Sequence, residues 1–103
     1  MPVRVVFRSQ AQADIEAIAD TIGAESTRQA AAWATDMRTR CLSLAKFPER
    51  SPVYSGEIRQ MVVGQYLVFY RIADPDIPNL RRVIVVRVIH GRRNISDVAD
   101  FED

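Results

Sequence analysis

Apolar residues recur at helical spacing in the first part of the chain. Four apolar residues between Ala11 and Ile22 form one stripe, whereas the acidic residues of this stretch, Asp14 among them, lie largely away from it. The pattern predicts an amphipathic helix over residues 9–22. Gly23 follows the last apolar position, where a helix commonly ends.

A second stripe of the same period follows directly. It contains Trp33, Met37 and Cys41, and it predicts a helix over residues 27–46. The link between the two predicted helices is short, which favours an antiparallel helical hairpin. We expect the three stripe residues to belong to the core, with Cys41 acting as a small buried hydrophobe.

The second half of the chain changes to short apolar runs rich in valine, isoleucine, tyrosine and phenylalanine, which favour β-strands. Gly64 suits a tight hairpin between two of these runs. Together with a β-branched run near the N-terminus, they predict strands at residues 3–7, 57–63, 66–72 and 82–90. The order β-α-α-β-β-β predicts an α+β fold, in which the helical hairpin packs on a mostly antiparallel four-stranded sheet.

The predicted sheet is apolar on both faces, although two helices can cover only one of them. Because side chains alternate between the faces of a strand, each strand can be divided into two sets. We expect the helices to cover the set without arginine. The set with arginine would then remain open as a docking surface for a partner. This second set comprises Arg59, Met61, Val63, Leu67, Phe69, Arg71, Val83, Val85, Arg87 and Ile89.

Length and composition fit one domain over residues 1–103. The formal net charge of +1 provides no strong overall field for nucleic acid, and we expect no direct sequence-specific nucleic-acid binding. The single cysteine, Cys41, permits neither an internal disulfide nor a cysteine-pair metal site, so we expect a cytoplasmic protein without metal or cofactor. We also expect no signal peptide and no membrane span, because the apolar runs are too short.

The near-neutral total conceals an uneven distribution of charge. Of the 14 basic residues, only Lys46 is a lysine. Residues 81–93 contain arginines and no acid, whereas residues 94–103 contain acids and no base. The planar guanidinium group suits bidentate contacts with anions and with the carboxylates of a partner.

Four short motifs occur in a recognisable order. They are Phe-x-Ser-x-Ala-x-x-Asp-Ile-x-x-Ile at 7–18, Arg-x-Met at 59–61, Tyr-x-Val-x-Tyr at 66–70 and Val-x-Arg-Val-Ile-His-Gly-x-Arg at 85–93. In this order they resemble the RelE/ParE superfamily of toxins from type II toxin–antitoxin modules, over nearly the whole chain. The long paired helices and the strand that ends in His-Gly-x-Arg look more like the ParE branch.

The resemblance implies a toxin of a plasmid-stabilisation type, which inhibits DNA gyrase and is neutralised by a ParD-like antitoxin in a hetero-oligomer. The candidate contacts with the target are Arg92 and Arg93, two adjacent cations after the last strand. In this family the C-terminal segment of the antitoxin lies on the toxin. Its candidate contacts here are Arg59, Met61, Leu67, Phe69, Arg71, Val85 and Arg87.

Two alternatives remain. The RelE branch is implied to cleave mRNA on the ribosome, and here His90 would act as base or acid while Arg59 and Arg93 neutralise phosphate. The tail at 94–103 lacks the tyrosine or extra basic residue usual in RelE-like nucleases, so we predict no enzyme activity and no catalytic residue. A simpler role for His90 is a hydrogen bond to the backbone at a strand end. The second alternative is a homologue that forms the complex without being toxic.

Overall fold

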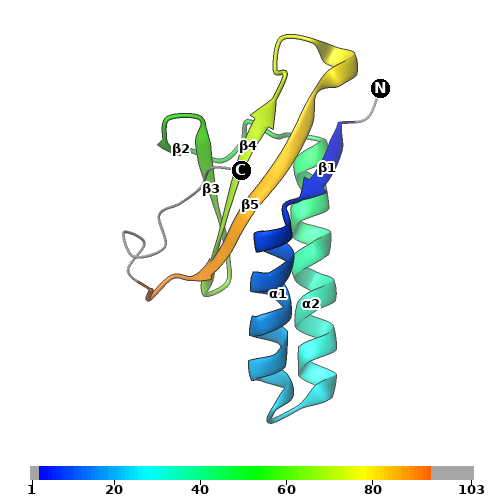
Figure 1. The fold of residues 1–103 in the computed structure, drawn as a ribbon, viewed down its shortest axis with the longest axis vertical. Helices are drawn as coiled ribbons and strands as arrows, with labels where there is room; N and C mark the ends of the chain where they lie inside the picture. The colour runs from blue at the N-terminus through cyan, green and yellow to red at the C-terminus, as the bar shows by residue number, and fades with distance from the viewer. Residues whose placement is uncertain (1–2, 94–103) are drawn as a thin grey trace.

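The computed structural model describes residues 3–93, with two long helices side by side and packed against one sheet (Figure 1). The α+β class and the helical hairpin predicted from the sequence are confirmed. The acidic segment at 94–103 lies outside the described residues. The elements are β1 (Arg4–Phe7), α1 (Ser9–Gly23), α2 (Thr27–Leu42), the 3-10 helix η1 (Ser43–Ala45), β2 (Val53–Ser55), β3 (Ile58–Val63), β4 (Tyr66–Ala73), the 3-10 helix η2 (Pro78–Leu80) and β5 (Arg82–His90).

The sheet has the strand order β1-β5-β4-β3-β2. β1 pairs in parallel with β5 and the other neighbours pair antiparallel, so the first and last strands of the chain lie side by side. The predicted count of four strands is wrong by one. β2 has only three residues, between Pro52 and Gly56, and it forms by pairing with β3. A single-strand pattern could not reveal it, because the pairing partner rather than its own sequence defines it.

The main hydrophobic core lies between the helical hairpin and one face of the sheet. Trp33 packs against this core and meets the ring of Tyr66 edge-on, with a centroid distance of 5.2 Å. Cys41 is fully buried, as predicted, and desolvation raises the pKa of its thiol to about 12 despite the nearby charge of Arg38. The buried members are Ala11, Ile15, Met37, Cys41 and Leu44 from the helical part, and Met61, Val63, Val68, Tyr70, Val83, Val85 and Val88 from the strands.

The predicted division of the sheet into faces is wrong for β3 and for the first half of β5. Met61 pairs with Val68 in register and therefore shares its face, under the helices. On β5 the register with β4 shifts, because Phe69 pairs with Arg87 whereas Tyr70 pairs with Val85. This bulge breaks the two-residue alternation within β5. The four residues that were expected on the open face, and that instead belong to the helix-side core, are Met61, Val63, Val83 and Val85.

A second apolar cluster occupies the opposite side of the sheet, which we call the distal face. It contains no helix residue. Leu67 and Phe69 lie on it as predicted, and Arg71 lies on it by its register with Ile84. Its buried members are Phe69, Ala73, Ile84, Val86 and Ile89, and the partly buried Ile58 and Leu67 pack against them.

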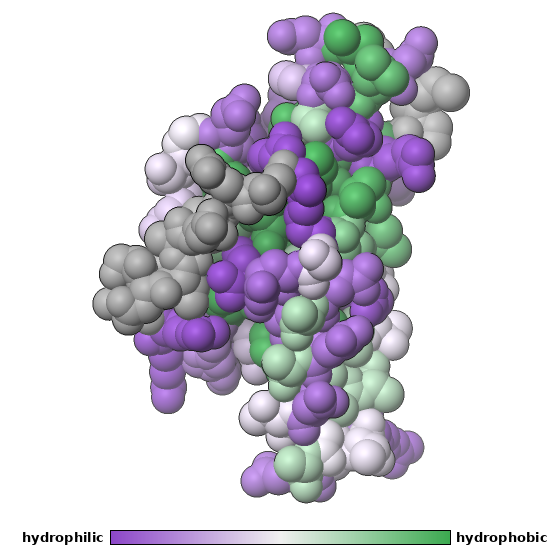
Figure 2. Space-filling model, in the orientation of Figure 1, coloured by the Kyte–Doolittle hydropathy of each residue, from purple (hydrophilic) through white to green (hydrophobic). Residues whose placement is uncertain are grey.

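Exposed apolar side chains gather at the turn between β4 and β5, at the top of the view in Figure 2. Ile77 and Leu80 in this turn are 50% and 55% exposed. The far end of the helical hairpin, at the bottom of the same view, is mostly polar or weakly apolar. In Figure 1 the tip of the helical hairpin extends below the sheet, and β5 ends to the left of the hairpin.

Candidate functional site

The predicted target-contact residues follow β5 in a compact turn. The backbone N–H of Arg93 donates to the carbonyl oxygen of His90 at 3.0 Å, and the N–H of Gly91 donates to that of Gln65 at 2.8 Å. A Cβ atom at position 91 would lie 3.2 Å from this second oxygen, so glycine permits the close approach. Arg92 is exposed, as is Arg93, and the turn therefore presents both cations on a fixed backbone.

His90 is held by both of its ring nitrogens. Nδ1 accepts a hydrogen bond of 3.0 Å from the backbone N–H of Arg92, so this nitrogen carries no proton. Nε2 lies 3.3 Å from Oε1 of Gln65 and donates to it in the matching tautomer. The imidazole also meets the ring of Tyr66 edge-on at 5.2 Å. The lone pair that a general base needs is therefore already engaged in the turn.

An open pocket of about 330 Å³ lies beside this turn, between the ends of β3, β4 and β5. Its lining combines the amide of Gln65, the phenol of Tyr66 and the cation of Arg92 with apolar surface from Val62 and Leu67. Arginine and tyrosine are enriched in protein–protein interfaces, so we treat this hollow as a candidate contact site for a partner.

Arg59 holds the chain that precedes β2. Its Nη1 donates to the carbonyl oxygens of Ser51 at 2.7 Å and of Glu49 at 3.2 Å. Arg59 pairs with Tyr70 of β4, whereas His90 pairs with Tyr66 of the same strand. The four residues from Tyr66 to Tyr70 correspond to roughly 13 Å along the sheet at the usual rise per residue. The structure does not bring together the set considered for RNA cleavage, and it gives Arg59 a structural role.

Arg87 forms an ion pair with α1 that the sequence did not indicate. Its Nε and Nη2 donate to the two carboxylate oxygens of Asp14 at 2.8 and 3.1 Å. The same carboxylate accepts the backbone N–H of Val88 at 2.9 Å, beyond the point where β1 ends its pairing with β5. Asp14 thus closes a free strand edge, and Arg87 points to α1 rather than across the distal face as predicted. Only its place in the 7–18 motif marked Asp14 beforehand.

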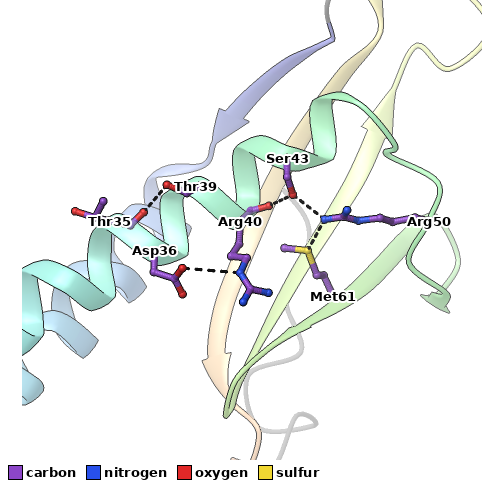
Figure 3. Close-up of polar contacts among 7 residues, drawn as sticks. All are labelled: Thr35, Asp36, Thr39, Arg40, Ser43, Arg50 and Met61. Carbon is purple, nitrogen blue, oxygen red and sulfur yellow. Dashed lines mark hydrogen bonds and ion pairs between the residues drawn. The ribbon is translucent and has the colours of Figure 1, made fainter.

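Met61 lies below the end of α2 and not on an open surface, as Figure 3 shows. Arg50 donates from Nη2 to Oγ of Ser43 at 2.6 Å and approaches the sulfur of Met61 at 3.9 Å. Ser43 in turn donates to the carbonyl oxygen of Arg40 at 2.5 Å. These contacts join the last turn of the helix to β3, and they account for the burial of a residue expected to bind the antitoxin.

Within residues 3–93, no three side chains of the metal-binding types gather where they could hold an ion. In the same range, the helices lack the length and apolar character that a membrane span requires.

The described residues form a small α+β protein with a helical hairpin on a mostly antiparallel sheet and an exposed basic turn after β5. The sequence model of the ParE toxin of type II toxin–antitoxin systems matches residues 5–95. "Toxin RelE2" of Caulobacter vibrioides is 35% identical over 91 residues, which is 87% of this chain and 97% of that protein. The chain therefore belongs to the ParE toxin family, within the RelE/ParE superfamily.

Two solved structures have the same fold. The chromosomal ParDE toxin–antitoxin system from P. aeruginosa gives a TM-score of 0.73 at 14% identity, covering 85% of this chain and 95% of the other. The toxin–antitoxin complex RelBE2 from Mycobacterium tuberculosis gives 0.60 at 22% identity, covering 87% and 99%. They confirm the predicted helical hairpin on a mostly antiparallel sheet.

Proposed function

We propose that this toxin acts on DNA gyrase in the cytoplasm, without nuclease chemistry, and that a ParD-like antitoxin neutralises it. The observation that carries the proposal is the state of His90, whose two ring nitrogens are committed to Arg92 and Gln65. Cleavage through a 2′-hydroxyl needs a positioned base, an acid and cations at the phosphate. Within residues 3–93, His90 is engaged and Arg59 serves the loop before β2, which supports a role in binding over one in cleavage.

The surface for the target is the turn after β5. Arg92 and Arg93 stand exposed on a backbone fixed by His90, and the adjoining pocket supplies apolar area and hydrogen-bonding groups. Cations held in a preorganised turn bind acidic protein surfaces without a large ordering cost. The double substitution Arg92→Ala/Arg93→Ala should raise the toxin concentration needed to inhibit gyrase supercoiling by about tenfold or more. A tenfold change corresponds to about 1.4 kcal/mol, on the order of the loss of two exposed ion pairs at an interface.

The matched control is Arg28→Ala/Lys46→Ala, which removes two exposed cations from the helical part and leaves the turn intact. The free energy of unfolding of both double variants should lie within about 0.5 kcal/mol of the parent value, as is usual for substitutions at exposed positions. Equal inhibition by the parent and the Arg92→Ala/Arg93→Ala chain would refute this site. Failure of the parent itself to inhibit supercoiling would refute the proposed target.

A second candidate function is ribosome-dependent cleavage of mRNA. The name of the relative "Toxin RelE2" favours it, because that relative is matched over nearly its whole length. The discriminating assay adds the purified chain to translating ribosomes and maps mRNA ends. Cleavage that is abolished by His90→Ala would establish the second candidate over the first. A chain inactive in both assays but able to bind its antitoxin would be a non-toxic homologue.

The titles of both structural neighbours describe toxin–antitoxin assemblies, which supports an antitoxin partner here. We place the antitoxin segment on the distal face, with Leu67, Phe69 and Arg71 as the remaining candidate contacts. Met61 and Val85 leave the set because they lie under the helices. Phe69 is 0% exposed and meets the ring of Tyr54 edge-on at 5.1 Å, so contact between Phe69 and an antitoxin segment requires neighbouring side chains such as Tyr54 to move.

A further inference from the structure

The tip of the β3–β4 hairpin lies beside the end of β5, at the lower end of the sheet in Figure 1. Its loop has two residues, and the first of them, Gly64, takes a φ of 59° that other residues rarely adopt. The second, Gln65, is exposed to solvent. Tyr66, the residue that follows, pairs in register with His90. The hairpin therefore brings Gln65 to the turn that follows β5.

Gln65 holds this turn at two points. Its backbone carbonyl oxygen accepts the N–H of Gly91 at 2.8 Å. Its side-chain oxygen Oε1 lies 3.3 Å from Nε2 of His90. The first contact belongs to the backbone and is available to any residue at this position. The second contact requires an acceptor at the end of a side chain of this length, so it is the one that depends on glutamine.

The direction of the side-chain contact follows from the backbone of Arg92. A backbone N–H can only donate a hydrogen bond, and that of Arg92 lies 3.0 Å from Nδ1 of His90. Nδ1 of the neutral imidazole therefore provides a lone pair, and Nε2 carries the proton. A protonated Nε2 needs an acceptor, which Oε1 of Gln65 supplies. Two hydrogen bonds thus connect Gln65, through the imidazole, to the backbone of Arg92.

This connection ends at the residues that present positive charge to the target. Arg92 and Arg93 are both exposed, and the N–H of Arg93 donates to the carbonyl oxygen of His90 at 3.0 Å. His90 therefore anchors the backbone of both arginines, and the orientation of its ring decides whether Nδ1 meets the N–H of Arg92. Cations on an ordered backbone bind a partner without the cost of ordering that backbone.

We propose that Gln65 is the positioning residue of the target-contact turn. By accepting the Nε2 proton it fixes the ring of His90, and the ring holds Arg92 and Arg93 in the conformation that binds the target. The effect on the target rests on the proposed function, whereas the effect on the turn does not. Substitutions at exposed positions usually change stability little, so loss of Gln65 should weaken the toxin without unfolding it.

The first test reads the imidazole directly. His90 is the only histidine of the chain, so its two ring nitrogens give signals without overlap in a ¹⁵N spectrum of the full-length protein. With the ring neutral, we expect a protonated Nε2 and an unprotonated Nδ1. A ring protonated at Nδ1, or an equal mixture of the two tautomers, would overturn the proposal.

The second test measures the order of the turn by ¹⁵N relaxation. Gln65→Met keeps the length of the side chain but replaces the amide by a thioether, a far weaker acceptor. The backbone order parameters of Arg92 and Arg93 should fall from about 0.85, the value of rigid backbone, to about 0.6. Gln65→Glu retains an acceptor and should keep the turn ordered. Tyr66→Phe, which keeps the edge-on ring contact with His90, is the matched control and should also keep it ordered. Unchanged order parameters in the Gln65→Met chain would refute the positioning role.

The third test is a double-mutant cycle on the inhibition of gyrase supercoiling. Gln65→Met should raise the toxin concentration needed for inhibition by about fivefold, the order expected for one hydrogen bond. In the His90→Ala background the same substitution should add less than about twofold, because Gln65 acts through the imidazole ring. Full additivity would mean that Gln65 acts independently of His90, contrary to the proposal. If the parent chain does not inhibit supercoiling, the proposed target is wrong, and the two spectroscopic tests still decide the role of Gln65.

Discussion

The contact between Asp14 and β5 gives the sharpest prediction about stability. Asp14 is 9% exposed and the side chain of Arg87 is 12% exposed, so the pair is nearly removed from solvent. Asp14→Ala deletes two charge-assisted hydrogen bonds to Arg87 and leaves the backbone N–H of Val88 without its carboxylate acceptor. Breaking a buried ion pair by removing one partner usually costs about 3–5 kcal/mol.

We expect the lower end of that range, about 3 kcal/mol, because Arg87 has further interactions that the substitution does not touch. For a domain of about 100 residues this corresponds to a fall in Tm of about 12–24 °C. Asp14→Asn keeps an acceptor for Val88 but loses the charge, so it should cost about half as much. Replacing Arg87 by Met in the Asp14→Ala background should recover part of the loss, since no buried charge is then stranded.

The assay is urea unfolding followed by far-ultraviolet circular dichroism and by the fluorescence of Trp33, which packs against the helix-side core. Coincident transitions from the two probes would justify a two-state analysis. Asp20→Ala is the matched control, because Asp20 is an exposed acid on the same helix, and it should change stability by no more than about 0.5 kcal/mol. A loss below about 1 kcal/mol for Asp14→Ala would refute the proposed role of this carboxylate at the edge of β5.

Three further predictions concern the core and the loop before β2. Met61→Ala should lower the free energy of unfolding in urea by about 2–5 kcal/mol, because Met61 is only 7% exposed. Val62→Ala, at a position 62% exposed, should be nearly neutral. Similar losses of stability for the two variants would contradict the assignment of Met61 to the helix-side core. Burial raises the pKa of the Cys41 thiol to about 12, so the reactive thiolate does not form at pH 8. Cys41 should therefore react with a thiol reagent at pH 8 only as the chain unfolds. Rapid labelling of the folded chain would contradict its burial. Arg59→Ala should accelerate proteolysis of the loop at 49–51 by removing both hydrogen bonds to its carbonyl groups, and Arg59→Lys should restore less than full protection.

The helices and four of the strands could be predicted because their apolar patterns are set by local period. The stripe through Met37 and Cys41 has one solution as a helix, and both residues are buried where the period placed them. β2 could not be predicted, because three residues beside Pro52 and Gly56 carry no periodic signal. Its existence depends on hydrogen bonds from a strand formed elsewhere.

Which side chains lie on which face of the sheet was harder to predict, for a physical reason. Every strand in the middle of the sheet is apolar on both sides, so the pattern within a strand cannot say which side meets the helices. The pairing of Met61 with Val68 and the bulge opposite Phe69 decide it, and both are properties of two strands together. The arginines were misleading guides for the same reason. Arg59 and Arg87 turned out to anchor the chain's own backbone and its own α1.

The candidate site was predictable in part. The exposed pair Arg92 and Arg93 lies on the surface as the sequence indicated, after a strand that ends at His90. The hydrogen bonds of the two imidazole nitrogens could not be predicted from the sequence. One partner is the backbone N–H of Arg92, and the other is the side chain of Gln65, which is distant in the chain. Asp14 illustrates the reverse case, in which a residue off the apolar stripe is buried because a strand edge needs its carboxylate.

The measurement that tests the central claim most directly is induced expression in a gyrase-dependent bacterium, with two readouts taken in parallel from the same culture. One readout is induction of the DNA damage response, and the other is the map of mRNA ends on ribosomes. The account predicts a damage response that depends on Arg92 and Arg93, with mRNA ends unchanged from those of an uninduced culture. Codon-phased mRNA cleavage without a damage response, abolished by His90→Ala, would contradict it.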